Sequence, residues 1–324
     1  MPEHLAFLAQ VIGGLVLLGW GGDRFVCGAS AMARNLGVTP LMIGLTIVSF
    51  ATSAPEFLVS TVATVRGQPS LAVGNAIGSN IANIGLVLGA VALIHPIKLQ
   101  TTTVQREMHV LLFVTFVTVF LFWDSLLNRF DGIILLTGLI IFAIWLVKRG
   151  TTLRVRDQRH DIDMRMRNAI FWLVIGIATL LYGAELLVTG AVGIAREFGV
   201  SEIIIGITLV ALATSLPELV VSAISTIKGE YGLALGNIVG SNIFNLLGVV
   251  GVAAVISDKS IELEPDVRSL HLVVMVGFTL ALLVMAYQRK DDSGISRFEG
   301  IMLVTAYLAF NAYLVAQNVR IENW

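Results

Sequence analysis

The chain has 324 residues, of which 56% are hydrophobic and 13% are charged, and its formal net charge is −1. Soluble domains carry about 25% charged residues, so this composition indicates a protein embedded in lipid rather than a soluble domain. The near-zero net charge gives no indication of nucleic-acid binding, and a single cysteine, Cys27, excludes a disulfide framework and a thiolate metal cluster.

Hydropathy divides the chain into ten predicted membrane-spanning helices, most of them close to the ~20 residues that cross a hydrocarbon core. One long polar connection, residues 148–167, separates the first five from the last five. We therefore predict an all-α polytopic membrane protein. Its first five helices lie in residues 1–148, a basic linker covers residues 149–167, and the last five helices lie in residues 168–324. In chain order, the predicted helices cover residues 5–33, 40–65, 70–94, 107–123, 130–148, 168–195, 202–227, 231–256, 267–288 and 298–318.

The two halves of the chain repeat each other. Residues 41–99 align with residues 203–261 without a gap, at a constant offset of 162 positions. Because each half holds an odd number of spans, the second half should insert upside down relative to the first, which gives the inverted-topology repeats of many secondary transporters. The matching stretches are ATSAPEFLVS (51–60) with ATSLPELVVS (213–222), and GNAIGSNIANIG (74–85) with GNIVGSNIFNLL (236–247).

Basic residues set the expected orientation. They concentrate in the 148–167 connection and in the loops on the same side, so the positive-inside rule places this connection in the cytoplasm and both termini outside. We expect a multi-pass protein of the cytoplasmic (inner) membrane that is surrounded by lipid. Nothing in the sequence points to an obligate protein partner.

The stretch ATSAPE in the second span combines a helix breaker with a carboxylate. In a helix, Thr52 and Ser53 lie on the same side as Glu56. Pro55 cannot donate to the carbonyl of Ala51, so the motif predicts a broken helix at the membrane midplane whose freed carbonyl lines an enclosed cavity. Hydroxyl, carboxylate and carbonyl oxygens are all ligands of hard cations such as Ca²⁺. The second half repeats the motif with Thr214, Ser215 and Glu218.

The stretch GNAIGSN in the third span offers a complementary polar face. Ser79 and Asn83 are four residues apart and share one side of a helix, and Ser241 and Asn245 match them in the second half. Other interpretations apply to the same residue types. Glycines four apart usually pack helices together, Ser and Thr often hydrogen-bond to their own helix, and Asn can join helices. We assign the glycines mainly to packing.

Glu56 and Glu218 are the residues hardest to explain by packing alone. A charge at the bilayer centre costs about 2.5–3.5 kcal/mol on insertion scales, and this chain incurs the cost at two matching positions. Two facing carboxylates carry a charge that one Ca²⁺ or two Na⁺ would neutralise and three Na⁺ would exceed. Competition between these ions for one site is a basis for exchange. A second matched acidic pair, Asp23 and Glu185, stays open between helix packing and an ion path.

The paired motifs ATSAPE…GNAIGSNIAN and ATSLPE…GNIVGSNIFN resemble the two alpha repeats of the calcium:cation antiporter superfamily, in particular the prokaryotic sodium/calcium exchangers. The resemblance covers essentially the whole chain and implies alternating access by sliding of the first and sixth spans across a fixed core. It also implies a set of cation ligands: Glu56 and Glu218 at the centre; Thr52, Ser53, Thr214 and Ser215 at flanking sodium sites; Ser79, Asn83, Ser241 and Asn245 around them; and the backbone carbonyls of Ser49 and Ala211.

The function implied is that of a secondary antiporter, not an enzyme, which admits Na⁺ and normally extrudes Ca²⁺ with net movement of charge. Ca²⁺ and Na⁺ are then its transported ligands, and no cofactor is expected. Two alternatives stay open: a Ca²⁺/H⁺ antiporter, in which Glu56 and Glu218 carry protons, and a potassium-dependent exchanger. Asn245 stands where some relatives carry Asp, which argues against potassium co-transport.

Overall fold

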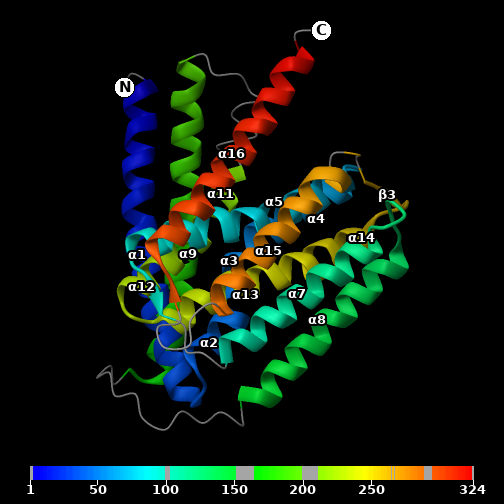
Figure 1. Ribbon diagram of the computed structural model, residues 1–324. Coiled ribbons are helices and arrows are strands. Elements are labelled where there is room, and N and C mark those ends of the chain that lie inside the picture. The colour runs from blue at the N-terminus through cyan, green and yellow to red at the C-terminus, as the bar shows by residue number, and fades with distance from the viewer. Residues whose placement is uncertain are drawn as a thin grey trace.

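The computed structural model describes residues 3–98, 103–150, 164–198, 211–263, 265, 267–287 and 294–322, and helices account for nearly all of them (Figure 1). The first half contains α1 (Glu3–Leu36), α2 (Pro40–Ile43), the π-helical turn η1 (Gly44–Val48), α3 (Ser49–Thr52), α4 (Ala54–Val65), α5 (Pro69–Ala82), the π-helical turn η2 (Asn83–Leu88), α6 (Gly89–Ile94), β1 (Ile97–Lys98), α7 (Thr103–Leu121), β2 (Leu126–Leu127) and α8 (Arg129–Gly150).

Where it is described, the second half has a similar order of elements, with the additional turn η5 before α15. It contains α9 (Met166–Glu197), α11 (Ala211–Thr214), α12 (Leu216–Ile227), α13 (Tyr231–Phe244), the π-helical turn η4 (Asn245–Val249), α14 (Val250–Ile256), β3 (Ile261–Glu262), the π-helical turn η5 (Val267–His271), α15 (Leu272–Tyr287), β4 (Gly294–Ile295) and α16 (Arg297–Glu322).

The predicted spans coincide with helices wherever the structure describes them. Seven helical stretches are long and apolar enough to cross a membrane, and the bent pair Pro40–Thr52 and Ala54–Val65 is an eighth. Helix α7 and the α11–α12 segment occupy two further predicted spans, and residues 202–210 lie outside the described residues. The protein is therefore a polytopic helical membrane protein.

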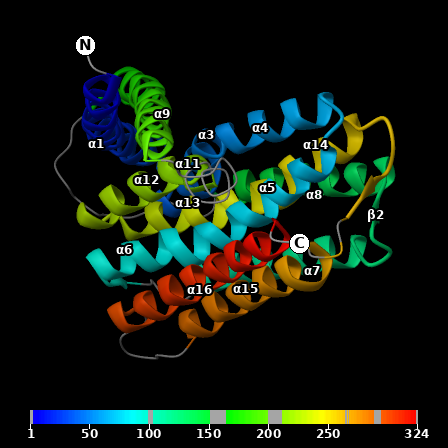
Figure 2. The ribbon, with the colours of Figure 1, turned by 90° about the horizontal axis from the view of Figure 1, so that it is seen from above.

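Helices α1 and α9 form a long antiparallel pair that crosses the other helices steeply (Figures 1 and 2). Glycines seven residues apart allow the two backbones to meet. A Cβ atom added at Gly14, Gly21 or Gly28 would lie within 2.7 Å of a backbone nitrogen of α9. Small residues at a helix contact are typical of close packing in membranes. The matching glycines of α9 that face α1 are Gly176, Gly183 and Gly190.

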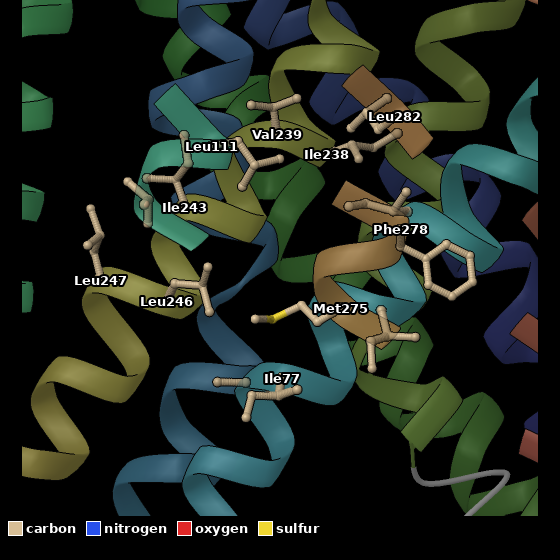
Figure 3. Close-up of a cluster of buried hydrophobic side chains, with 14 of the residues drawn as sticks. Ile77, Leu111, Ile238, Val239, Ile243, Leu246, Leu247, Met275, Phe278 and Leu282 are labelled. Atoms are coloured by element: carbon tan, nitrogen blue, oxygen red, sulfur yellow. The ribbon is translucent and has the colours of Figure 1, made fainter. Parts of the chain in front are cut away.

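Two separate apolar clusters hold the helices together. The larger cluster joins α5, α7, α13 and α15, and its buried side chains include Ile77, Ile238 and Phe278 (Figure 3). The smaller cluster surrounds α1 and α9 and includes Phe25 and Leu180. The α1–α9 pair therefore shares an apolar cluster with parts of the broken helices, such as Val48 and Val221, and this cluster is separate from the larger one.

Two short antiparallel ribbons tie the connections of the larger bundle together. Ile97 of β1 pairs with Ile295 of β4, which joins the α6–α7 connection to the α15–α16 connection. Leu126 of β2 pairs with Glu262 of β3, which joins the α7–α8 connection to the chain after α14. These ribbons brace the bundle against which the broken helices pack.

Candidate ion-binding site

Both proline-containing motifs break their helices at the centre of the molecule. Helix α3 ends at Thr52 and α4 begins at Ala54, and Ser53 between them leaves helical geometry with a ψ of 7°. Ser215 forms the turn between α11 and α12, with a ψ of 0°. Proline in the first turn of α4 and of α12 explains the break, because it removes a backbone donor and crowds the preceding turn. The first broken helix bends by 44°.

Glu218 is fully buried and accepts hydrogen bonds from two other segments. Ser53 Oγ donates to Glu218 Oε1 at 3.1 Å, and Ser241 Oγ donates to the same oxygen at 3.4 Å. Thr52 donates to Asn237 Oδ1 at 2.9 Å. Hydroxyl groups of the first broken helix therefore face the polar groups of the second half.

Glu56 is equally buried, and the side chain of Thr214 lies near its carboxylate, but neither carboxylate oxygen accepts a well-formed hydrogen bond within the described part of the chain. The second carboxylate oxygen of Glu218 and the hydroxyl of Ser215 are in the same condition. Buried polar atoms are normally paired, and a buried charge without a partner is strongly unfavourable. These oxygens are available to ligate a cation.

In each half, one asparagine donates hydrogen bonds to the backbone of the buried glutamate and to a serine. Asn237 Nδ2 donates to Ser222 Oγ at 3.0 Å and to the carbonyl oxygen of Glu218 at 3.4 Å. The repeat equivalents Asn75, Ser60 and Glu56 make the same two contacts, at 3.1 Å and 3.4 Å. The sequence interpretation did not assign these four Asn and Ser residues to the site. Their matching positions in both halves are the signal that could have identified them.

A second group of amides lies between α5 and α13. Asn83 Nδ2 donates to Asn242 Oδ1 at 3.5 Å, and Asn80 Nδ2 donates to the carbonyl oxygen of Asn242 at 3.2 Å. Asn83 and Asn245 each begin a π-helical turn, which changes the directions of side chains relative to an α-helix. Neither amide atom of Asn245 has a hydrogen-bond partner in the described residues.

The remaining predicted ligands lie on the same elements. Ser79 is buried on α5, which packs against α4 and α11, while Thr214 is partly buried at the end of α11. The carbonyl oxygen of Ser49 accepts hydrogen bonds from the backbone nitrogen of Ser53 at 2.9 Å and from Thr52 Oγ1 at 3.3 Å. Ala211 begins α11, directly after the residues that the structure does not describe.

Glycines bring α13 against the first broken helix. A Cβ atom added at Gly236 would lie 2.5 Å from the carbonyl oxygen of Leu41 and 2.9 Å from the Cα atom of Gly44. Gly240 has similarly close neighbours in the same segment, so the packing interpretation is confirmed for these two glycines. At the repeat equivalents Gly74 and Gly78, an added Cβ atom would meet no described atom within 4 Å, so the packing interpretation is wrong for these two glycines.

The polar centre combines two acidic groups with neutral oxygen donors. Among the described residues, no three side chains of the His, Cys, Asp and Glu types converge. Carboxylate, hydroxyl and amide oxygens are instead the ligands of hard cations. Glu56 and Glu218 lie close enough to repel each other when both are ionised, and a cation between them would relieve that repulsion.

The sequence of this chain matches a known family of membrane proteins in both halves. The family model described as "Sodium/calcium exchanger protein" matches residues 6–148 and again residues 168–316. The chain belongs to the sodium/calcium exchanger family. This confirms the resemblance that the paired motifs indicated. Because the family consists of exchangers, the protein is a membrane transporter of cations rather than an enzyme.

Relatives match this exchanger over nearly its whole length. "Putative antiporter CaxA" of Alkalimonas amylolytica is 44% identical over 94% of this chain and 97% of that protein. "Sodium/calcium exchanger MaX1" of Methanosarcina acetivorans is 30% identical over 92% of this chain and 95% of that protein. A solved structure of the sodium-calcium exchanger NCX_Mj superposes with a TM-score of 0.83 at 34% identity, and the match covers 95% of this chain and 99% of that one.

Proposed function

We propose that this exchanger is a secondary antiporter that carries Na⁺ in one direction and Ca²⁺ in the other through the polar centre. The observation that supports the proposal most directly is the pair of buried carboxylates, Glu56 and Glu218. Three of their four oxygens accept no well-formed hydrogen bond from the described residues, although the Thr214 side chain lies near Glu56. A bound cation offsets the large cost of burying such charges.

Glu56 and Glu218 are the central ligands in this proposal, because their combined charge is neutralised by one Ca²⁺. The six to eight oxygens that Ca²⁺ prefers would be completed by neutral donors. The remaining proposed ligands are Thr52, Ser53, Thr214, Ser215, Ser79, Asn83, Ser241 and Asn245, together with the backbone carbonyls of Ser49 and Ala211.

The hydroxyl groups beside the carboxylates favour Na⁺ over H⁺ as the counter-ion. Ser53 reaches Glu218 across the two halves of the chain at 3.1 Å, and Thr52 lies next to it in sequence. A metal cation needs several oxygens around it, whereas a proton needs one acceptor. Ca²⁺/H⁺ exchange on the same two carboxylates is the rival function. The neutral Asn245 argues against a potassium-dependent reaction, which is the other rival.

We further propose ten spans in two inverted repeats, residues 1–148 and 168–324, with the linker in the cytoplasm and both termini outside the inner membrane. The antiparallel α1–α9 pair, with its separate apolar cluster, would slide across the larger bundle during alternating access. Exchange of three Na⁺ for one Ca²⁺ would move one net charge, worth about 2.3 kcal/mol per 100 mV, and would extrude Ca²⁺ at a negative internal potential.

Uptake of radioactive Ca²⁺ into proteoliposomes tests the proposed coupling. Vesicles are loaded with Na⁺, with K⁺ or with acid, and Glu56→Gln protein provides the blank. Uptake that requires internal Na⁺ and responds to an imposed voltage is the expected result. Uptake driven by internal acid without Na⁺ would replace the proposal by Ca²⁺/H⁺ exchange, and voltage-independent uptake would contradict net charge movement.

A further inference from the structure

Helix α12 is attached to α1 by charged residues that lie outside the polar centre. Lys228 Nζ is 2.6 Å from Asp23 Oδ1 and 2.9 Å from Cys27 Sγ. Arg34 Nη1 on the same helix α1 is 3.4 Å from Glu230 Oε1. The turn that follows α12 is therefore held to α1 at two charged points.

Apolar side chains pack along the same contact. A Cβ atom added at Gly22 of α1 would lie 2.7 Å from Val220 Cγ1 and 2.8 Å from Ile224 Cδ1. Both side chains belong to the apolar cluster around α1 and α9. Val220, Ile224 and Lys228 follow one another at four-residue intervals, so one side of α12 and the residue that caps it face α1.

The matching side of α4 makes no such contact. At the offset of 162 residues it carries Leu58, Val62 and Arg66, and Leu58 and Val62 are 64% and 39% exposed. No residue of α4 belongs to the cluster around α1 and α9. Glu185 of α9, which matches the acidic residue of α1, is exposed, and within the described residues it forms no ion pair with Arg66.

We propose that Glu185 and Arg66 form the ion pair of a second conformation, in which α4 docks on α9 as α12 docks on α1 here, and that the Asp23–Lys228 pair breaks there. This inference rests on the exchange function and inverted repeats proposed above. The α12–α1 contact and the proposed α4–α9 contact would lie on opposite sides of the ion-binding centre. Each contact would close the ion path on its own side. Forming one while breaking the other would move access from one side of the membrane to the other.

The side chains of the second contact suit this role. Ala184 stands in α9 where α1 has Gly22, so the approach of α4 would be wider by one methyl group. Glu185 is longer than aspartate by one methylene group, and Arg66 presents a forked cation in place of an ammonium. The longer acid compensates for the wider approach.

Paired-cysteine cross-linking tests the inference without measuring transport. In a Cys27→Ser background, which removes the one cysteine of the chain, one variant carries Asp23→Cys with Lys228→Cys. The other carries Glu185→Cys with Arg66→Cys. Each pair has one cysteine in each half of the chain. Cleavage at a protease site inserted into the linker therefore gives two fragments on a denaturing gel, unless a short bis-thiosulfonate has cross-linked the two cysteines.

Both pairs should cross-link, and their yields should change in opposite directions, by about twofold or more, when the bath is changed between Na⁺, Ca²⁺ and neither ion. A Glu185→Cys, Arg129→Cys protein measures random encounters, since Arg129 contacts Ser257 elsewhere. A Glu185–Arg66 yield no higher than this control in all three baths would overturn the inference, as would two yields that rise and fall together. Opposed yields in protein that exchanges no Ca²⁺ would refute the proposed function and support this inference.

Charge exchange gives a second test on the intact exchanger. Arg66→Glu should lower the exchange rate about tenfold, because like charges then oppose the second conformation. Adding Glu185→Arg should restore most of the rate. The same test applies to the first pair, in which Lys228→Asp is compared with the double variant that exchanges Asp23 and Lys228. If the exchange restores activity for this pair but not for Arg66 and Glu185, the assignment of the second pair is wrong.

Discussion

Glu56 and Glu218 stand at matching positions of nearly identical motifs, yet their surroundings differ. Glu218 Oε1 accepts hydrogen bonds from Ser53 at 3.1 Å and Ser241 at 3.4 Å, whereas Glu56 has the Thr214 side chain nearby but accepts no well-formed hydrogen bond from the described residues. Motifs that are alike in both halves cannot by themselves cause this difference. It arises from packing, since α12 docks on α1 and the matching side of α4 is exposed.

The hydrogen bonds that a carboxylate accepts in one conformation need not match its importance for transport over a whole cycle. If the two halves exchange surroundings during alternating access, the poorly bonded carboxylate becomes the well-bonded one in the other conformation. Both carboxylates are then equally necessary for transport, although only Glu218 accepts well-formed hydrogen bonds here. Variants at matched positions test whether the two halves exchange surroundings.

The largest effect is expected at the carboxylates themselves. Glu56→Gln and Glu218→Gln should each lower Ca²⁺ uptake by about 100-fold or more, because Ca²⁺ affinity depends steeply on the number of ligand charges. Glu299→Gln is the control, since Glu299 accepts a hydrogen bond from Ser296 at the start of α16 and should leave uptake unchanged. If either central variant still transports Ca²⁺ while eluting as folded protein, the two carboxylates do not form one site.

A smaller effect is expected at the asparagines behind the carboxylates. Asn237→Ala should lower uptake about tenfold, because it removes the donor to Ser222 and the acceptor of Thr52 together, and each buried unpaired group costs about 1–3 kcal/mol. Asn75→Ala should lower thermal stability less than Asn237→Ala does, because Asn237 also accepts a hydrogen bond from Thr52. Asn311→Ala, whose amide donates to the carbonyl oxygen of Tyr307 in α16, is the control. Equal stability losses at Asn75 and Asn237 would contradict the difference between the halves.

The helices and their breaks could be predicted from the sequence because their causes are local. Apolar runs define spans, and Pro55 removes a backbone donor within its own turn. The pairing of Ser53 with Glu218 could not be predicted in this way, since the two residues are 165 positions apart and meet only through packing of the two halves. The π-helical turns at Asn83 and Asn245 were also missed, because no local residue pattern specifies them.

The hydroxyl groups should affect sodium dependence by a smaller factor. Thr52→Val and Ser215→Ala should each raise the Na⁺ concentration needed for half-maximal uptake by roughly three- to tenfold, which corresponds to the loss of about one neutral oxygen contact. Calcium dependence should change less, because neither variant removes a charge. Uptake measured against Na⁺ and Ca²⁺ in turn separates the two effects. An equal loss for both ions would contradict separate sodium sites.

The smallest effect at neutral pH, and the sharpest test of the difference between the halves, is expected at a matched pair of amides. Asn245→Asp removes no ligand charge and no hydrogen bond, because the amide atoms of Asn245 have no partner in the described residues, so we expect uptake within about threefold of the parent. In Asn83→Asp, the same change replaces the Nδ2 donor to Asn242 Oδ1 with a second acceptor, so the loss should be larger.

Acidic buffer should reduce the difference between Asn245→Asp and the parent, because protonation of the added carboxylate returns the site to two charges. The measurement is Ca²⁺ uptake by the parent and both variants over a series of buffers from acidic to alkaline. Equal losses for the two variants at every pH would mean that the amides are equivalent. The asymmetry between the halves would then stop at the carboxylates and would not extend to the surrounding ring of ligands.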